Sequence, residues 1–176
     1  MIVLGVDPGQ NIGWTALDIH GAAARWIASG VARQLTIEPG RILFDGDAVV
    51  LTGDCAPALI VVESVNRVYP RERFCTNMAT AIATAERVCG QVLGAAAAAL
   101  IPTEEVAAGT WRSALAGRAN ADDALVKKFV LARVTGWPRR SASHARDAAG
   151  AAIYGAMRHS FQQLIRRAAK DPPAAT

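Results

Sequence analysis

Residues 5–14 read GVDPGQNIGW, a stretch in which an aspartate follows an apolar run and the chain then turns at once. The preceding residues 2–6 are apolar apart from a glycine and do not alternate strictly with polar ones, which predicts a short buried strand. Pro8 and Gly9 form a turn signal directly after it. We therefore expect Asp7 to lie at the tip of a buried strand, where the chain turns away.

The rest of the chain predicts a meander of strands followed by alternating helices and strands. Further strands are expected at 13–19, 23–32, 57–64 and 100–102, and helices at 38–54, 78–100, 104–117, 121–136 and 143–169. Asn120 is the expected N-cap of the fourth helix and Gly136 its end. This order predicts an α/β fold with a mixed sheet flanked by helices. We expect a single domain over residues 1–170 and a frayed tail at 171–176.

Composition limits the class of protein. Of the 176 residues, 52% are apolar, which excludes a disordered chain. Cys55, Cys75 and Cys89 are widely spaced and odd in number, which argues against a disulfide framework or a zinc site and for a reducing compartment. The apolar run 92–101 is about half of a membrane span, and the N-terminus lacks the pattern of a signal peptide. We expect a cytoplasmic protein that contacts no membrane.

A second carboxylate occupies a position that corresponds to Asp7. The strand expected at 57–64 is apolar until Glu63, so Glu63 lies near its end. If the two strands are parallel neighbours, both carboxylates emerge at the same edge of the sheet. Two carboxylates at such a distance repel each other and are held by a cation or a shared proton. Because Mg²⁺ prefers oxygen ligands, a divalent cation is the favoured solution.

The start of the last helix supplies two more candidate ligands. His144 and Asp147 are three residues apart, and therefore on one face of its first turn. The adjoining residues Ala148, Ala151, Ala152 and Gly155 are small, so the helix can pack closely on the sheet. Close packing brings His144 and Asp147 towards Asp7. Each feature is also common without a metal. An Asp before Pro-Gly often forms a turn, a Glu at a strand end is often solvated, and a His-Asp pair at a helix start often caps the helix. Their joint occurrence is much more specific.

These segments resemble the active-site blocks of a known family. VLGVDPGQNIGWTALD, LIVVESV and SHARDAAGAAIYG, in this order, are similar to blocks of the RuvC family of Holliday-junction resolvases. The likeness covers roughly residues 2–160. It implies an RNase H-like fold with a five-stranded mixed sheet. It also implies a homodimer that cuts a four-way DNA junction by paired symmetric nicks.

The resemblance assigns the four candidate residues to one catalytic metal site. It places Asp7, Glu63, His144 and Asp147 around two Mg²⁺ ions per subunit, for which Mn²⁺ can substitute, about 4 Å apart and bridged by Asp7. Many members have an aspartate where this chain has His144. Imidazole is a poorer Mg²⁺ ligand than carboxylate. We therefore expect His144 either to bind a metal, the favoured interpretation, or to move protons near the scissile phosphate.

The basic residues indicate a polyanionic partner. The net charge is +4, and arginine carries nearly all of the positive charge. The loop 66–77 mixes arginine and aromatic residues, where the family carries an aromatic residue that enters the junction centre. Its candidate DNA contacts are Arg67, Tyr69, Arg71, Arg73 and Phe74, with either aromatic residue as the inserted one. The family also has lysines before the last helix. Here Arg112 takes one of these positions. The other has Asp123 near it, and Lys127 or Lys128 lies one turn later.

Other functions are compatible with parts of the pattern. A RuvC-type nuclease could cut other branched or flap DNA, or RNA–DNA hybrids. A non-catalytic module could bind junctions without cutting them, although it would not need all three carboxylates. Nucleotide-binding proteins of the actin and sugar-kinase type also open with a strand, an Asp and a glycine-rich turn, but this chain is too short for their duplicated domain. The sequence does not identify a branch-migration helicase partner.

Overall fold

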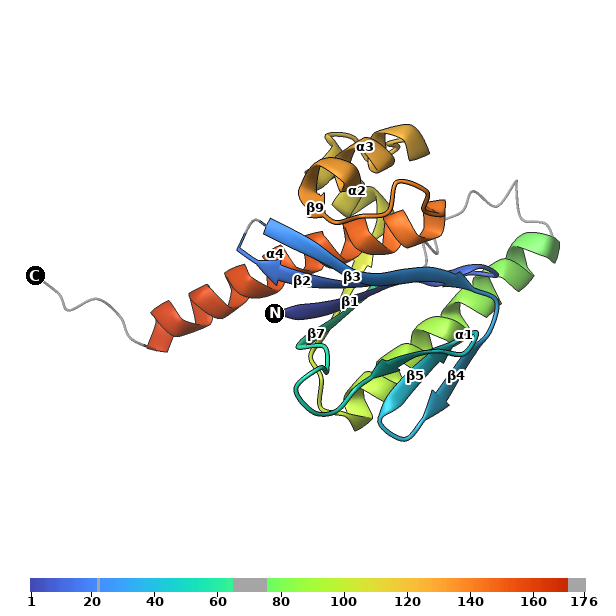
Figure 1. Ribbon diagram of the computed structural model, residues 1–176, viewed down its shortest axis with the longest axis horizontal. Helices are drawn as coiled ribbons and strands as arrows, with labels where there is room; N and C mark the ends of the chain where they lie inside the picture. Colours follow the sequence, from blue (N-terminus) through green and yellow to red (C-terminus); the bar gives the residue numbers. More distant parts are fainter. Residues whose placement is uncertain (22, 65–75, 171–176) are drawn as a thin grey trace, which may run out of the picture.

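A central six-stranded sheet dominates the computed structural model, which describes residues 1–21, 23–64 and 76–170 (Figure 1). The strand order is β8-β7-β1-β2-β3-β9. The strands are β1 (Ile2–Asp7), β2 (Ile12–His20), β3 (Ala23–Ala32), β7 (Leu59–Ser64), β8 (Thr103–Ala107) and β9 (Val134–Thr135). β1, β2 and β3 form an antiparallel meander, whereas β7 and β8 run parallel to β1 and β9 runs parallel to β3. The prediction of a mixed sheet flanked by helices is confirmed, with the two-residue β9 as an additional strand.

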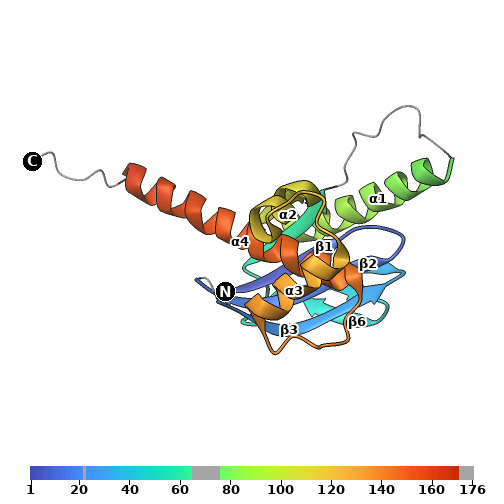
Figure 2. The same ribbon diagram turned by 90° about the horizontal axis from the view of Figure 1, so that it is seen from above.

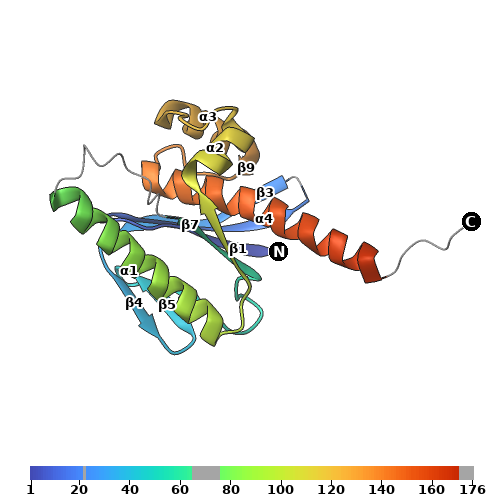
Figure 3. The ribbon, with the colours of Figure 1, turned by 180° about the vertical axis from the view of Figure 1, so that it is seen from behind.

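Helices cover both faces of this sheet. One face carries α2 (Ala108–Ala116), α3 (Asp123–Arg133) and α4 (Ser143–Lys170), and the other carries α1 (Thr76–Ala98) (Figures 1 and 3). The side chains of successive β1 residues point alternately to the two faces of the sheet. Val3 packs in the core with α4, and Leu4 packs in the core with α1. Because side chains alternate along a strand, a strand buried on both faces is apolar throughout.

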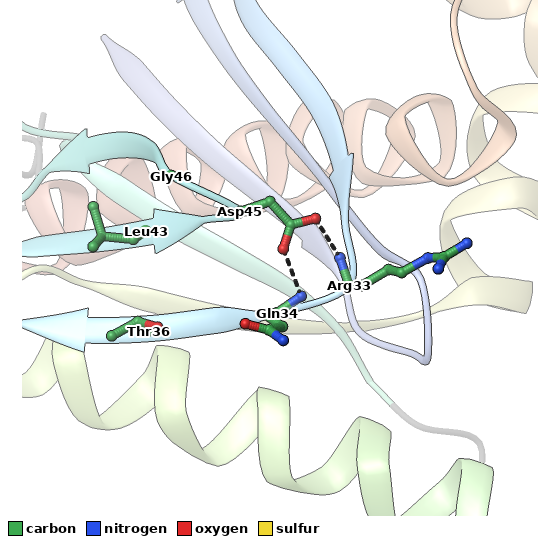
Figure 4. Close-up of a pocket in the computed structure, with 6 residues that line it drawn as sticks. All are labelled: Arg33, Gln34, Thr36, Leu43, Asp45 and Gly46. Carbon is green, nitrogen blue, oxygen red and sulfur yellow. Dashed lines mark hydrogen bonds between the residues drawn. The ribbon is translucent and has the colours of Figure 1, made fainter.

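A second, three-stranded sheet replaces the helix expected at 38–54. It consists of β4 (Leu35–Glu38), β5 (Arg41–Phe44) and β6 (Asp47–Val50), and lies on the α1 side. Gly40, Gly46 and Asp45 have positive φ angles, which tight turns require and a helix excludes. The Asp45 carboxylate accepts hydrogen bonds from the backbone N–H groups of Arg33 and Gln34, at 2.8 and 2.9 Å (Figure 4). These bonds fix the end of β5 against the start of β4.

The segment between α1 and α3 also differs from the prediction. Residues 100–102 are not a strand, and residues 103–107 form β8 rather than the start of a helix. Pairing with β7 makes the difference, since Val61 and Val62 lie opposite Glu104 and Glu105. A tertiary partner thus outweighs the local helix preference.

The ends of the fourth predicted helix shift as well. The N-cap of α3 is Asp122 and not Asn120, because the Asp122 side chain accepts the Leu125 backbone N–H. The helix ends at Arg133, and Gly136 follows with a positive φ angle.

The first half of α4 lies against the sheet, and its second half extends past it (Figure 2). Its buried residues belong to the first half, from Ala145 to Ala156, whereas Phe161 and Leu164 are exposed. The predicted last helix at 143–169 is confirmed to within one residue. Across the described residues, no helix combines the length and apolar character needed to cross a membrane.

Candidate metal centre

Two carboxylates lie at the same edge of the sheet, as the strand pattern predicts. β1 and β7 are parallel neighbours, and Val6 lies opposite Val62. Asp7 and Glu63 each follow directly after these paired residues. Because parallel strands end at a common edge, both side chains emerge beside each other. The rigid sheet therefore fixes two candidate ligands that are 56 positions apart in sequence, the difference between 63 and 7.

Small residues allow α4 to bring its first turns onto this edge. A Cβ atom at Gly13, on β2, would overlap the backbone carbonyl of His144. A Cβ atom at Gly5, on β1, would overlap the backbone carbonyl of Ala148. Ala148, Ala151 and Ala152 are fully buried, so the predicted close packing of helix on sheet is confirmed. The approach depends on glycine in the strands as well as on alanine in the helix.

Asp7, His144 and Asp147 form a compact group of possible metal ligands. One donor atom from each lies within 4.8 Å of the other two. Nδ1 of His144 is 2.8 Å from Oδ2 of Asp7. This contact raises the pKa of His144 above its ordinary value, although partial burial opposes the shift. When protonated, His144 therefore compensates part of the negative charge of Asp7.

Glu63 lies outside that group of three but interacts electrostatically with Asp7 and Asp147. Its side chain is half-buried, and Nε1 of Trp111 donates a hydrogen bond to Oε2 at 2.9 Å. Burial, and then repulsion from Asp7, raises the pKa of Glu63 to about 8, while the Trp111 bond opposes this. Such a pKa indicates a carboxyl group that needs a nearby cation to stay ionised.

Arg112 supplies positive charge at the opposite side of the group. Its Nη2 is 3.0 Å from Oδ1 of Asp147, and its guanidinium lies over the Trp111 ring, 5.2 Å from the centroid. Burial raises the pKa of Asp147, and the charge of Arg112 limits the increase. The sequence assigned Arg112 to DNA contact. The structure places it beside the acidic group.

The other predicted DNA contacts are not brought to this edge in the described residues. Lys127 and Lys128 are exposed on α3. The loop candidates lie outside the described residues, namely Arg67, Tyr69, Arg71, Arg73 and Phe74. Their roles stay predictions.

Two functional candidates were missed by sequence reasoning. Trp111 is fully buried, and its indole N–H has the hydrogen-bond partner that a buried indole normally needs, but the tertiary structure sets this burial and no local pattern signals it. Arg146 is 5% exposed, and its Nη2 donates to both carboxylate oxygens of Asp123, at 2.6 and 2.7 Å. It also donates to the backbone carbonyl of Ser141 and so ties the start of α4 to α3. No local pattern in the sequence signals this pair.

Curated relatives are similar in sequence to almost the whole chain. A crossover junction endodeoxyribonuclease RuvC from Albidiferax ferrireducens is 30% identical over 185 aligned positions, which span 97% of this chain and 91% of the relative. The chain belongs to the RuvC family. A RuvC from Acidovorax sp. is 31% identical over 87% of this chain and 83% of its own length. One from Aliivibrio fischeri is 29% identical over 86% and 84%. The chain is thereby assigned to a family of endonucleases, although no family model matches it.

Solved RuvC structures share the fold. The RuvC of Thermus thermophilus superposes with a TM-score of 0.58 at 21% identity, over 92% of this chain and 97% of that one. A structure of T. thermophilus RuvC in complex with a Holliday junction substrate gives a TM-score of 0.62 at 20% identity, over 92% and 96%. The expected RNase H-like architecture is therefore confirmed.

Proposed function

We propose that this protein is a metal-dependent endonuclease that resolves four-way DNA junctions by paired symmetric nicks. The observation that carries the proposal is the group of Asp7, His144 and Asp147, whose donor atoms lie within 4.8 Å of one another in a RuvC-family chain. Their position at a sheet edge, on β1 and the first turns of α4, holds the three donors rigidly.

The chemistry of the donors fits divalent cations. Carboxylate oxygens suit Mg²⁺ and Mn²⁺, and the imidazole of His144 favours Mn²⁺ over Mg²⁺. The acidic residues have compensating partners, since Arg112 pairs with Asp147 and His144, when protonated, pairs with Asp7. We infer that Asp7, Glu63, His144 and Asp147 hold two cations per subunit. When bound, such cations activate a water and stabilise the leaving oxygen of a phosphodiester.

The protein's own residues orient the substrate. The Nε of Arg112 is buried and has no hydrogen-bond partner among the described residues. The Arg112 side chain is nevertheless 25% exposed beside Asp147, so the other guanidinium nitrogens can donate a hydrogen bond to a phosphate oxygen. Pro8 and Gly9 turn the chain away after Asp7, which leaves space for a DNA strand at the edge. Lys127 and Lys128 are proposed to contact the phosphates of a junction arm.

The substrate assignment rests on the relatives. They are named crossover junction endodeoxyribonucleases, and one solved relative was captured with a Holliday junction. A four-way junction has two equivalent strands to cut, so we infer a homodimer with two sites related by a twofold axis. We propose that α1 contributes to the interface, because its alanine-rich surface permits close approach. We propose a cytoplasmic location, as the sequence predicts.

Cleavage of a synthetic mobile four-way junction tests the proposal. Each strand is labelled in turn, and the protein is incubated with Mg²⁺, with Mn²⁺ or with EDTA. We expect nicks at symmetric positions in two opposite strands, only when a cation is present. If flap DNA or an RNA–DNA hybrid were cut as fast as the four-way junction, the protein would be a nuclease of broader specificity and not a junction resolvase. Junction binding without cleavage in either cation would contradict the enzyme assignment.

A further inference from the structure

The indole of Trp111 contacts Glu63, the metal-ligand candidate on β7. Trp111 is fully buried, and its Nε1 donates to Oε2 of Glu63 at 2.9 Å. An indole N–H can donate but cannot accept. It therefore fixes Oε2 as an acceptor and leaves the second carboxylate oxygen, Oε1, without this constraint.

The surroundings of the ring prevent it from turning. A Cβ atom at Gly150, on α4, would overlap the six-membered ring of Trp111, so the ring occupies a recess in the helix surface. The guanidinium of the next residue, Arg112, lies over the ring and reaches Asp147 at 3.0 Å. Residues 111 and 112 thus contact two acids from two different elements, one on β7 and one on α4.

We infer that Trp111 is a positioning residue that holds the Glu63 carboxylate in the orientation in which it binds a divalent cation. Partners of metal ligands fix the rotamer of the ligand, and their loss typically lowers metal affinity 10- to 100-fold. The inference rests on the proposed function, because it concerns the same cation site. By its burial alone, Trp111 would be regarded only as a residue of the hydrophobic core.

A pair of matched variants tests this role. Trp111→Phe keeps an aromatic ring but removes the N–H donor. Trp26→Phe makes the same change on β3, where the indole Nε1 donates to the hydroxyl of Ser29 at 3.0 Å, away from the acidic edge. Mn²⁺ affinity is measured by isothermal titration of metal-free protein. We expect about 10-fold weaker binding for Trp111→Phe and wild-type affinity for Trp26→Phe.

A second measurement on intact protein remains informative if Trp111→Phe does not fold. The four tryptophans give four indole N–H signals in a ¹⁵N-correlated NMR spectrum. The Trp111 signal should move in Glu63→Gln and should broaden with substoichiometric Mn²⁺ before the Trp26 signal does.

The outcomes separate this inference from the proposed function. The positioning role would be overturned if Trp111→Phe bound Mn²⁺ with wild-type affinity. It would also be overturned if the Trp111 signal changed neither in Glu63→Gln nor on addition of Mn²⁺. If wild-type protein itself bound no Mn²⁺, the proposed function would fail instead.

Discussion

The carboxylates on the two sides of the candidate metal centre have different kinds of hydrogen-bond partner. On one side Asp7 pairs with His144, whose side chain is 42% exposed. On the other side Glu63 accepts a hydrogen bond from Trp111, which is fully buried. On the open side, the imidazole of His144 can move away from Asp7 or change its protonation state. On the buried side, the neutral indole N–H of Trp111 can do neither. We therefore expect the open side to face the substrate and the buried side to set the geometry.

The largest expected effect is on the carboxylate that joins the two sides. Asp7→Asn removes a charged ligand next to His144 and near Glu63, so cleavage of a four-way junction should fall by more than about 100-fold, beyond the loss for an indirect partner. Junction binding should persist, since the basic residues are unchanged. Asp47→Asn is the matched control, because Asp47 is exposed on β6. Wild-type cleavage by Asp7→Asn with Mg²⁺ would exclude a ligand role for Asp7.

Metal affinity should depend steeply on pH, because both sides hold a proton that competes with a cation. The pKa of His144 is raised above its ordinary value of 6.5, and that of Glu63 is raised to about 8. Each proton must leave before the group binds metal. Between pH 6.5 and pH 8, Mn²⁺ affinity should therefore increase about 10- to 100-fold. Isothermal titration across this range checks the slope, and a flat profile would show that neither group binds the ion.

Exchange of the imidazole for a carboxylate separates the two roles considered for His144. If His144 is a ligand, His144→Asp should retain cleavage within about 10-fold and shift the preference from Mn²⁺ towards Mg²⁺. His144→Ala serves as the control that removes any ligand. Initial cleavage rates in the two cations measure the ratio. Loss of activity in both variants to the same extent would favour proton transfer instead.

The smallest expected effect is a gain in stability on the buried side. Because the pKa of Glu63 is raised from 4.5 to about 8, its ionisation opposes folding of the metal-free protein. This cost is absent below pH 4.5, grows as the pH rises, and is complete above pH 8. Glu63→Gln should therefore be more stable than wild type by about 1 kcal/mol at pH 8, a value reduced for partial exposure.

Chemical denaturation in EDTA measures this difference. Glu105→Gln is the control, since Glu105 is exposed on the neighbouring β8. The two variants should behave alike near pH 4.5 and diverge as the pH rises. A Glu63→Gln variant that is less stable than wild type at pH 8 would contradict the conclusion that ionisation of Glu63 opposes folding.

The sequence predicted the open side of the site better than the buried side. Asp7, His144 and Asp147 follow local rules, namely the end of an apolar strand and a spacing of three on a helix. Trp111 meets Glu63 across 48 positions of sequence, through the pairing of β7 with β8, which no local pattern encodes. Arg146 and Asp123 were missed for the same reason.

The same contrast explains the errors in the fold. The residues 38–54 contain apolar side chains that suit the period of a helix as well as that of a strand. In the structure Gly40, Gly46 and Gly53 have positive φ angles, so they mark turns. The long buried strands and α4 were predicted correctly, because their length leaves a single periodic solution.

A crystal soaked in Mn²⁺ and measured at the manganese absorption edge tests the central claim most directly. The account predicts anomalous peaks between Asp7, Glu63, His144 and Asp147, with Trp111 still bonded to Glu63. Side chains that stay in place with no ion among them would contradict it.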